Sequence, residues 1–265
     1  YYKFILIPIF IIFFLHLKHY YQNNEKNEIL QANNLINTKV EELLYQKLPT
    51  IFTNTMDSWE ELVHWSPEYL LKYKIDDFKY YSYDNTIIEK SKYKYKHISD
   101  ISFANFINTL NNNKMFAISK NFIKDNKIDV KNNISNIIGQ MMYITENEIY
   151  IGKNSEKLYI KTENTYRNLF CQIYGTCKIY LWNPSQRKYL YPDDCYDPNI
   201  TYSKINFKDY DNKKYSTFNN SKYIEIIMNP GQILYIPPYW WYSFRFLDNT
   251  NIVYFNYNTA INVIA

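Results

Sequence analysis

The chain has 265 residues, of which 46% are hydrophobic and 19% aromatic, including 30 tyrosines but only 4 glycines. A chain this rich in aromatic residues folds rather than staying disordered, and its length allows one large domain plus a tail. The net charge of +4 is spread over 30 basic and 26 acidic residues. Because neither sign dominates, the composition argues against a nucleic-acid partner.

Residues 1–21 are predicted to form a signal anchor or transmembrane segment. Phe4–Leu15 is an apolar run behind Lys3, and it reaches the length of a membrane span only if it continues to Tyr21. The segment His16–Gln22 lacks the small residues of a signal-peptidase site, which favours an anchor over a cleaved signal peptide. The predicted location is a membrane, crossed once, with the endoplasmic reticulum or secretory pathway as the candidate compartment. A buried helix of a soluble protein is the weaker alternative.

Two helical regions are expected before the main domain. Residues 22–48 are predicted to form a polar helical stem that carries an apolar stripe and ends before Pro49. Residues 49–114 are predicted to form a helical prelude. This prelude opens with a short strand at Ile51–Thr53, and Ser66-Pro67-Glu68 marks the start of one of its helices.

Residues 115–265 are predicted to form a β-barrel of short strands, so the fold class is mainly β with a helical N-terminal part. Tight-turn chemistry such as Asn229-Pro230-Gly231 separates the apolar segments, which is typical of a sandwich or closed barrel. The polar segment from Ser185 to Ser221 is expected to be a long loop with little structure of its own. The candidate strands are Met115–Ser119, Gln140–Ile144, Glu148–Gly152, Asn168–Tyr174, Cys177–Trp182, Tyr223–Met228, Ile233–Ile236, Trp241–Phe246 and Ile252–Tyr257.

Two cysteines flank a predicted turn at Tyr174-Gly175. Cys171 and Cys177 could face each other across this hairpin and form a disulfide in an oxidising compartment. The favoured interpretation is that both are small core residues.

Five segments, in order, resemble the cupin-like, JmjC-type domain of the 2-oxoglutarate/Fe(II) oxygenase superfamily. The resemblance runs from about Glu42 to Asn258 and is nearest to the factor-inhibiting-HIF asparaginyl hydroxylase and related small JmjC hydroxylases. It implies a double-stranded β-helix, the cupin or jelly-roll barrel, preceded by helices. The segments are Lys47–Ile51, Ser58–Leu70, Ser102–Leu110, Asn168–Pro184 and Asn229–Trp241.

In that family two histidines and one carboxylate hold Fe(II) and leave positions open for 2-oxoglutarate and oxygen. Counting back from Asn168, the resemblance places the first ligand pair at Thr162 and Asn164, and moving the register by one residue gives Lys161 and Glu163 instead. The distal histidine falls at Tyr242, after the tryptophan pair. The resemblance therefore implies no metal site and no catalytic residue. The histidines of the chain, all outside the candidate strands, are His16, His19, His64 and His97.

The co-substrate pocket of the family is also altered. The lysine that pairs with 2-oxoglutarate falls at Cys177, and a Ser/Thr of the pocket falls near Tyr159, while Asn168 and Asn256 match family asparagines. Alternation along the strand places Tyr242, Phe244 and Phe246 on one face, where their rings would fill the cavity. The tryptophans Trp240 and Trp241 are expected at the barrel mouth. The remaining polar groups, Thr162, Asn164, Asn168 and Asn256, are expected to hydrogen-bond one another or Tyr242.

These features predict a membrane-anchored cupin-like domain that has lost oxygenase chemistry and acts as a binding or structural module. The expected partner is a protein, a peptide or a second copy of the domain, and no cofactor is expected. One alternative is an active JmjC-type hydroxylase or demethylase with an atypical metal site, which would need Fe(II) and 2-oxoglutarate. Another is a cupin that binds a sugar or other small ligand, supported by analogy of fold alone.

Overall fold

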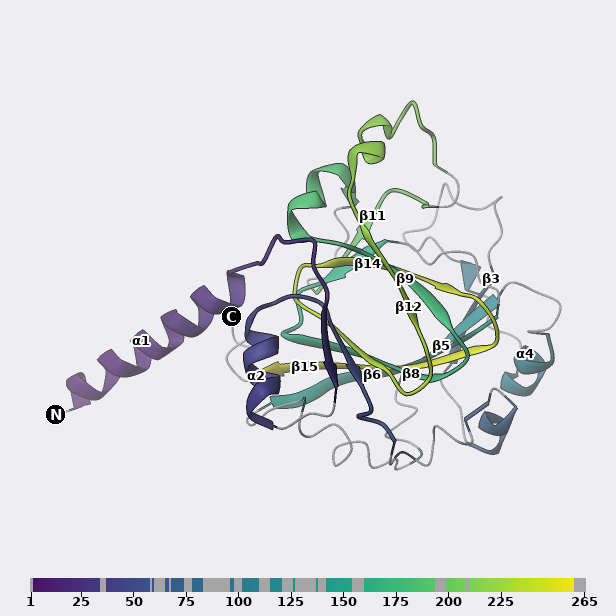
Figure 1. Ribbon diagram of the computed structural model, residues 1–265, viewed down its shortest axis with the longest axis horizontal. Helices are drawn as coiled ribbons and strands as arrows, with labels where there is room; N and C mark the ends of the chain where they lie inside the picture. The colour runs from purple at the N-terminus through teal and green to yellow at the C-terminus, as the bar shows by residue number, and fades with distance from the viewer. Residues whose placement is uncertain are drawn as a thin grey trace.

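Two β-sheets face each other and enclose the centre of the chain (Figure 1). The computed structural model describes residues 2–33, 37–57, 59, 65–66, 68–73, 78–82, 96–97, 102–109, 115–120, 126, 137, 142–153, 160–193, 199–207 and 210–259. The nine-stranded sheet has the order β1-β2-β13-β8-β15-β6-β5-β3-β4, and the six-stranded sheet has the order β10-β11-β7-β14-β9-β12. The prediction of a mainly β fold is confirmed, and the arrangement agrees with the expected jelly-roll barrel.

The bounds of the elements are as follows. The larger sheet consists of β1 Leu30–Asn33, β2 Thr50–Thr53, β3 Phe78–Ser82, β4 Lys96–His97, β5 Met115–Lys120, β6 Met142–Gly152, β8 Arg167–Tyr174, β13 Ile233–Ile236 and β15 Thr250–Thr259. The smaller sheet consists of β7 Lys161–Glu163, β9 Cys177–Trp182, β10 Pro192–Asp193, β11 Ile200–Ser203, β12 Ile224–Met228 and β14 Trp241–Phe246. The helices are α1 Tyr2–Tyr21, α2 Asn37–Tyr45 and α4 Phe103–Thr109, with 3-10 helices η1 Tyr69–Lys72, η2 Pro184–Tyr189 and η3 Ser216–Asn220.

The strands near the centre are buried on both faces because both faces are covered. On β8, Phe170 points into the barrel, whereas its neighbours Leu169 and Cys171 belong to a second core on the outer face of the larger sheet. This second core includes Val40 of α2 and Phe106 of α4. A strand covered on both sides is buried along nearly its whole length, as β8 is from Arg167 to Ile173.

The turn between β8 and β9 depends on Gly175. Its φ of +66° is a left-handed conformation that favours glycine, and a Cβ there would overlap the carbonyl oxygen of Asn249. The two cysteines around this turn are free and lie in different cores, Cys171 outside the barrel and Cys177 inside it. Burial raises the pKa of both thiols. The interpretation as core residues is confirmed, and the disulfide alternative is wrong.

Part of the predicted helical stem is a strand. Leu30–Asn33 forms β1, which pairs in parallel with β2 so that Leu30 lies opposite Thr50. Leu30 and Ala32 are half-buried and alternate with exposed residues, a period of two that suits a sheet edge rather than a helix. Within residues 22–48, the described helix is α2, Asn37–Tyr45.

The segment from Ser185 to Ser221 has more structure than predicted. It contains η2, β10, β11 and η3, and its apolar side chains join a third core on the outer face of the smaller sheet. Leu190, Ile205 and Phe218 pack there against Trp182 and Trp241. The loop prediction is wrong because these widely spaced apolar residues only become contiguous after the segment folds back on the sheet.

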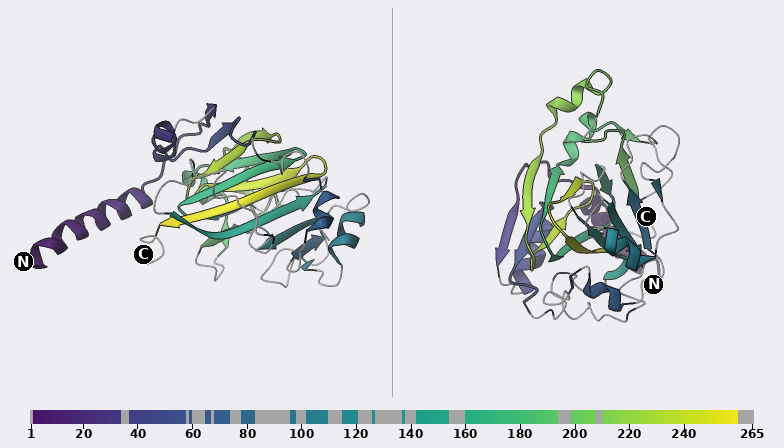
Figure 2. Two further views of the ribbon diagram at one scale, coloured as in Figure 1. Left: turned by 90° about the horizontal axis from the view of Figure 1, so that it is seen from below. Right: turned by 90° about the vertical axis from the view of Figure 1, so that its right-hand side faces the viewer.

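Helix α1 projects away from the barrel, and its N-terminus is the most distant point of the molecule (Figures 1 and 2). Seven of its apolar side chains between Ile7 and Leu15 are 52–68% exposed. Among the described residues, no helix is long and apolar enough to cross a membrane. The transmembrane prediction for residues 1–21 is therefore not supported; the apolar run ends at His16, and Lys18 and His19 follow within the same helix.

Candidate functional site at the barrel centre

The pairing of β7 with β14 decides which side chains enter the barrel. Tyr242 lies opposite Lys161, and Trp241 lies opposite Thr162. Residues directly opposite each other in a sheet share a face, so Lys161 and Tyr242 point inward, and Glu163 follows two residues after Lys161 on the same face. The structure therefore adopts the register with Lys161 and Glu163, not the one with Thr162 and Asn164.

The register counted from the sequence is off by one residue. Lys161, which faces the barrel, precedes Asn168 by seven positions, whereas the count from the resemblance used six. Thr162 faces the third core, on the outer face of the smaller sheet, and its hydroxyl is buried with no hydrogen-bond partner among the described residues. Asn164 lies past the end of β7, where its backbone N–H donates to Asn199. The expected contact of Thr162 or Asn164 with Tyr242 is accordingly absent from the described contacts.

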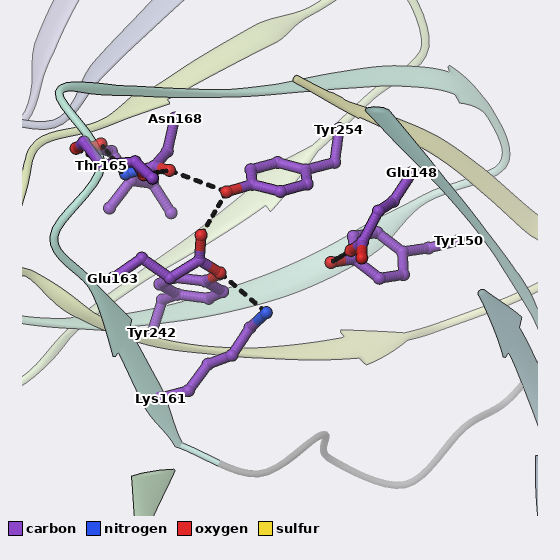
Figure 3. Close-up of polar contacts among 9 residues, drawn as sticks. Glu148, Tyr150, Lys161, Glu163, Thr165, Asn168, Tyr242 and Tyr254 are labelled. Atoms are coloured by element: carbon purple, nitrogen blue, oxygen red, sulfur yellow. Dashed lines mark hydrogen bonds and ion pairs between the residues drawn. The ribbon is translucent and has the colours of Figure 1, made fainter. Parts of the chain in front are cut away.

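Glu163 is the centre of the site and is only 3% exposed (Figure 3). The Lys161 ammonium lies 2.8 Å from Glu163 Oε1. The hydroxyl of Tyr242 donates to the same oxygen, and the hydroxyl of Tyr254 donates to Oε2. A cation and two phenols thus satisfy both oxygens of one carboxylate.

Asn168 extends this network along β8. Its Oδ1 lies 2.8 Å from the Tyr254 hydroxyl and also accepts from the hydroxyl of Thr165, while its Nδ2 lies 3.3 Å from the carbonyl of Ile236. Asn256 lies directly opposite Asn168 in the neighbouring strand. The two asparagines expected in the pocket are therefore brought together, in a network that the protein itself satisfies.

Aromatic rings fill the space around the network. The ring of Phe170 lies 4.6 Å from that of Tyr254, 4.8 Å from Phe244 and 5.3 Å from Tyr242, measured between centroids. Beyond the Glu163 network, the hydroxyl of Tyr150 donates to Glu148 Oε2 at 2.6 Å (Figure 3). The expectation that aromatic rings occupy the barrel is confirmed for Tyr242, Phe244 and Phe246, which all belong to the inner core.

The other predicted pocket residues are distributed more widely. Cys177 is buried in the inner core, and its Sγ lies 3.1 Å from Gln172 Oε1. Trp240 belongs to the core inside the barrel, and Trp241 belongs to the third core, on the outer face of the smaller sheet. The two tryptophans therefore face opposite sides of the sheet and do not lie together at the barrel mouth. Tyr159 lies outside the described residues. Sequence reasoning missed Tyr254, although its position two residues before Asn256 on the same strand face was a usable signal.

The charges at the centre are set by burial and by each other. Burial favours protonation of Glu163, but the nearby ammonium of Lys161 and the hydrogen bonds from Lys161, Tyr242 and Tyr254 outweigh it, so the pKa of Glu163 lies below its ordinary value. Burial favours loss of the Lys161 proton, but the charge of Glu163 outweighs that, so the pKa of Lys161 is raised. Burial and the charge of Glu163 raise the pKa of both phenols. At neutral pH the centre is one ion pair with two neutral phenols.

This ion pair predicts a loss of stability in acid. Since the pKa of Glu163 is lower in the folded chain than its ordinary value of 4.5, the unfolded chain binds a proton more readily. The free energy of unfolding should be constant above that value and fall as the pH drops through the folded-state pKa. Urea unfolding between about pH 7 and pH 3 measures this. The double variant Lys161→Met/Glu163→Gln should show a shallower decline, and an unchanged decline would contradict the assignment.

The residues at the centre do not fit an Fe(II) site. Three neutral or anionic donors are needed around an open position. Of the three inward positions, Lys161 carries an ammonium, which repels a metal cation. Tyr242 carries a neutral phenol that donates a hydrogen bond to the carboxylate of Glu163. Among the described residues no group of three or more His, Cys, Asp or Glu side chains could hold a metal ion.

A sequence profile of the family described as "Cupin-like domain" matches residues 37–262. The chain belongs to the cupin-like domain family. This cupin-like domain is similar to "JmjC domain-containing protein D" of Dictyostelium discoideum, with 36% identity over 83 residues, 31% of this chain and 18% of that protein. It is also similar to "Lysine-specific demethylase 8" of Xenopus tropicalis, with 32% identity over 88 residues, 32% of this chain and 19% of that protein. The JmjC-type resemblance is therefore confirmed.

The solved structure of E. coli ycfD is similar to the cupin-like domain, with a TM-score of 0.56. The match covers 85% of this chain and 53% of that one, at 14% sequence identity, which shows a likeness of fold alone. The cupin-like domain spans less than a quarter of the length of the two curated relatives, at 18% and 19%.

Proposed function

We propose that this JmjC-type cupin-like domain has lost iron-dependent oxygenase chemistry and acts as a binding or structural module. The observation that carries this proposal is the fully bonded carboxylate of Glu163. In an oxygenase of this family one carboxylate would help to neutralise a metal ion. Here the ammonium of Lys161 supplies the positive charge instead, and the phenols of Tyr242 and Tyr254 take up the carboxylate oxygens.

The alternative, an active hydroxylase or demethylase, would require ligands that the barrel centre lacks among its described residues. His97 lies in β4 at the edge of the larger sheet, and His64 lies outside the described residues. A packed interior also disfavours a sugar-binding cupin. The proposed partner is instead a protein or peptide, or a second copy of the chain, bound on the outer surface, and no cofactor is required.

The proposal is tested by titrating the full chain with Mn(II) and 2-oxoglutarate under tryptophan fluorescence. Trp240 is buried in the inner core beside Tyr242, so its emission should respond to anything that enters the barrel. We expect no saturable change in protein that circular dichroism shows to be folded. A saturable response that requires the metal would overturn the proposal and favour the enzyme alternative.

We also propose that the protein attaches to a membrane surface through α1. Support comes from the exposed side chains Ile7, Ile9, Phe10, Ile11, Ile12, Phe14 and Leu15, which are distributed around the whole helix rather than along one stripe. A protein partner covers one face of a helix, whereas lipid covers all of them. At about 1.5 Å per residue, Ile7 to Leu15 rises roughly 12 Å, somewhat less than half of a ~30 Å hydrocarbon core.

Flotation with phosphatidylcholine vesicles tests this attachment. The double variant Phe10→Glu/Phe14→Glu should lose vesicle binding, because two charges would have to enter the lipid. Tyr174→Glu is the matched control, since Tyr174 is also exposed and aromatic but lies at the β8–β9 turn. Retention of the double variant on vesicles would contradict the proposal.

A further inference from the structure

A cavity of about 420 Å³ lies where α1 meets the rest of the chain. Its walls come from His19 near the end of α1, from residues 22–25 that follow the helix, and from residues 45–47 at the end of α2. The lining is polar and includes amide side chains, and it is separate from the barrel centre. The proposed function of the barrel uses none of these residues.

Lys47 lines the cavity. The residue is only 6% exposed, and its ammonium donates to the carbonyl oxygen of Gln22 at 2.8 Å and to that of His19. Carbonyls at the end of a helix have no partner within the helix, so Lys47 stabilises the end of α1 and holds it against the domain. Burial lowers the pKa of Lys47 to about 8, which leaves the side chain mostly protonated at neutral pH.

His19 provides a second polar group on the wall. Its ring stacks on Tyr45 with 4.2 Å between centroids, which fixes its orientation. The Nε2 atom is buried and has no hydrogen-bond partner among the described residues. Glu25 also lines the cavity and is exposed, whereas Lys47 is buried. A ligand that enters therefore meets a buried ammonium and an imidazole nitrogen that has no hydrogen-bond partner among the described residues.

We propose that this cavity binds the phosphate of a phospholipid headgroup. The inference rests on the membrane attachment proposed for α1. The exposed apolar part of α1 ends at Leu15, and His19 follows four residues later, a rise of about 6 Å. The headgroup layer of a bilayer is of similar thickness, roughly 5–8 Å on each side of the hydrocarbon. With the apolar part of α1 in the acyl chains, the cavity lies at the level of the phosphates.

The test compares vesicles of phosphatidylcholine with vesicles of digalactosyldiacylglycerol, a neutral bilayer lipid without phosphate. The full chain should bind the phospholipid vesicles about tenfold more tightly, the effect of one charge-assisted hydrogen bond. Lys47→Met should remove this preference. Lys18→Met is the matched control, because Lys18 carries the same charge on the exposed side of α1 but does not line the cavity. His19→Ala, which leaves the Lys47 contacts in place, should weaken the preference without releasing α1.

Each outcome separates the two proposals. Equal binding to both vesicles would overturn the headgroup site and leave the attachment through α1 standing, whereas binding to neither would overturn the attachment itself. An equal loss in Lys18→Met and Lys47→Met would assign the preference to general electrostatic attraction and overturn the site. An excess of inorganic phosphate should reduce the preference for phospholipid vesicles, because the free anion competes with the lipid phosphate for the same ammonium. A preference that saturating phosphate leaves unchanged would overturn the assignment to the phosphate group.

Discussion

Replacing Lys161 with methionine is expected to lower the free energy of unfolding by about 3–5 kcal/mol, the effect of leaving one member of a buried ion pair without its partner. Methionine preserves the volume and flexibility of the lysine stem but removes the charge. Glu163 would then be a buried carboxylate whose charge is opposed only by hydrogen bonds from two phenols. Urea unfolding at neutral pH measures the loss.

The decisive comparison is with the double variant Lys161→Met/Glu163→Gln. The glutamine oxygen can still accept from one of the two phenols, and its amide N–H can donate to the hydroxyl oxygen of the other. Removing both charges together should therefore recover most of the lost stability. The loss of stability in the double variant should then be much smaller than the sum of the two single losses. Lys178→Met is a matched control at the surface, where Lys178 pairs with Glu225 at 2.6 Å in an exposed setting, and it should have a much smaller effect. Additive losses from Lys161→Met and Glu163→Gln would contradict a coupled pair at the barrel centre.

The sequence predicted the features of the fold that depend on neighbouring residues, and it missed those that depend on residues far apart in the chain. The hairpin around Gly175 and the inward alternation of Tyr242, Phe244 and Phe246 follow from period-two patterns and turn chemistry, and both are present. The third core was missed because Leu190, Ile205 and Phe218 are apart in sequence and meet only in the folded chain. The strand β1 was missed because four residues carry too little periodicity to outweigh the helical composition around them.

The sequence placed Tyr242 inside the barrel, but beside it the sequence placed Thr162 and Asn164 where the structure has Lys161 and Glu163. The inward position of Tyr242 could be located because the tryptophan pair precedes it directly. The first ligand pair was placed by counting back from Asn168 across a turn, and a single additional residue in a turn exchanges the two faces of a strand. No sequence pattern fixes the length of that turn. The pairing of Lys161 with Tyr242 shows which residues of β7 face the barrel, and it therefore identifies Glu163 as the buried carboxylate.

The same geometry predicts that two substitutions create a metal site. Lys161→His/Tyr242→His would place two imidazoles opposite each other on β7 and β14, with Glu163 on the same face two residues from the first. Two histidines and one carboxylate with open positions are the ligand set that holds Fe(II) and its substitutes. We expect the folded double variant to retain about one Co(II) per chain through gel filtration and to show the visible absorption of coordinated Co(II), whereas the natural chain should do neither.

The control for this variant decides between the two registers. Thr162→His/Tyr242→His carries the same number of histidines, but Thr162 lies opposite Trp241 and faces the third core. That variant should bind no more Co(II) than the natural chain. Binding by the Thr162 variant and not by the Lys161 variant would mean that Thr162 and Asn164 face the barrel after all. Binding by the Lys161 variant alone would mean that one cation has been exchanged for another at Glu163, because the ammonium of Lys161 must leave before a metal ion can occupy its place.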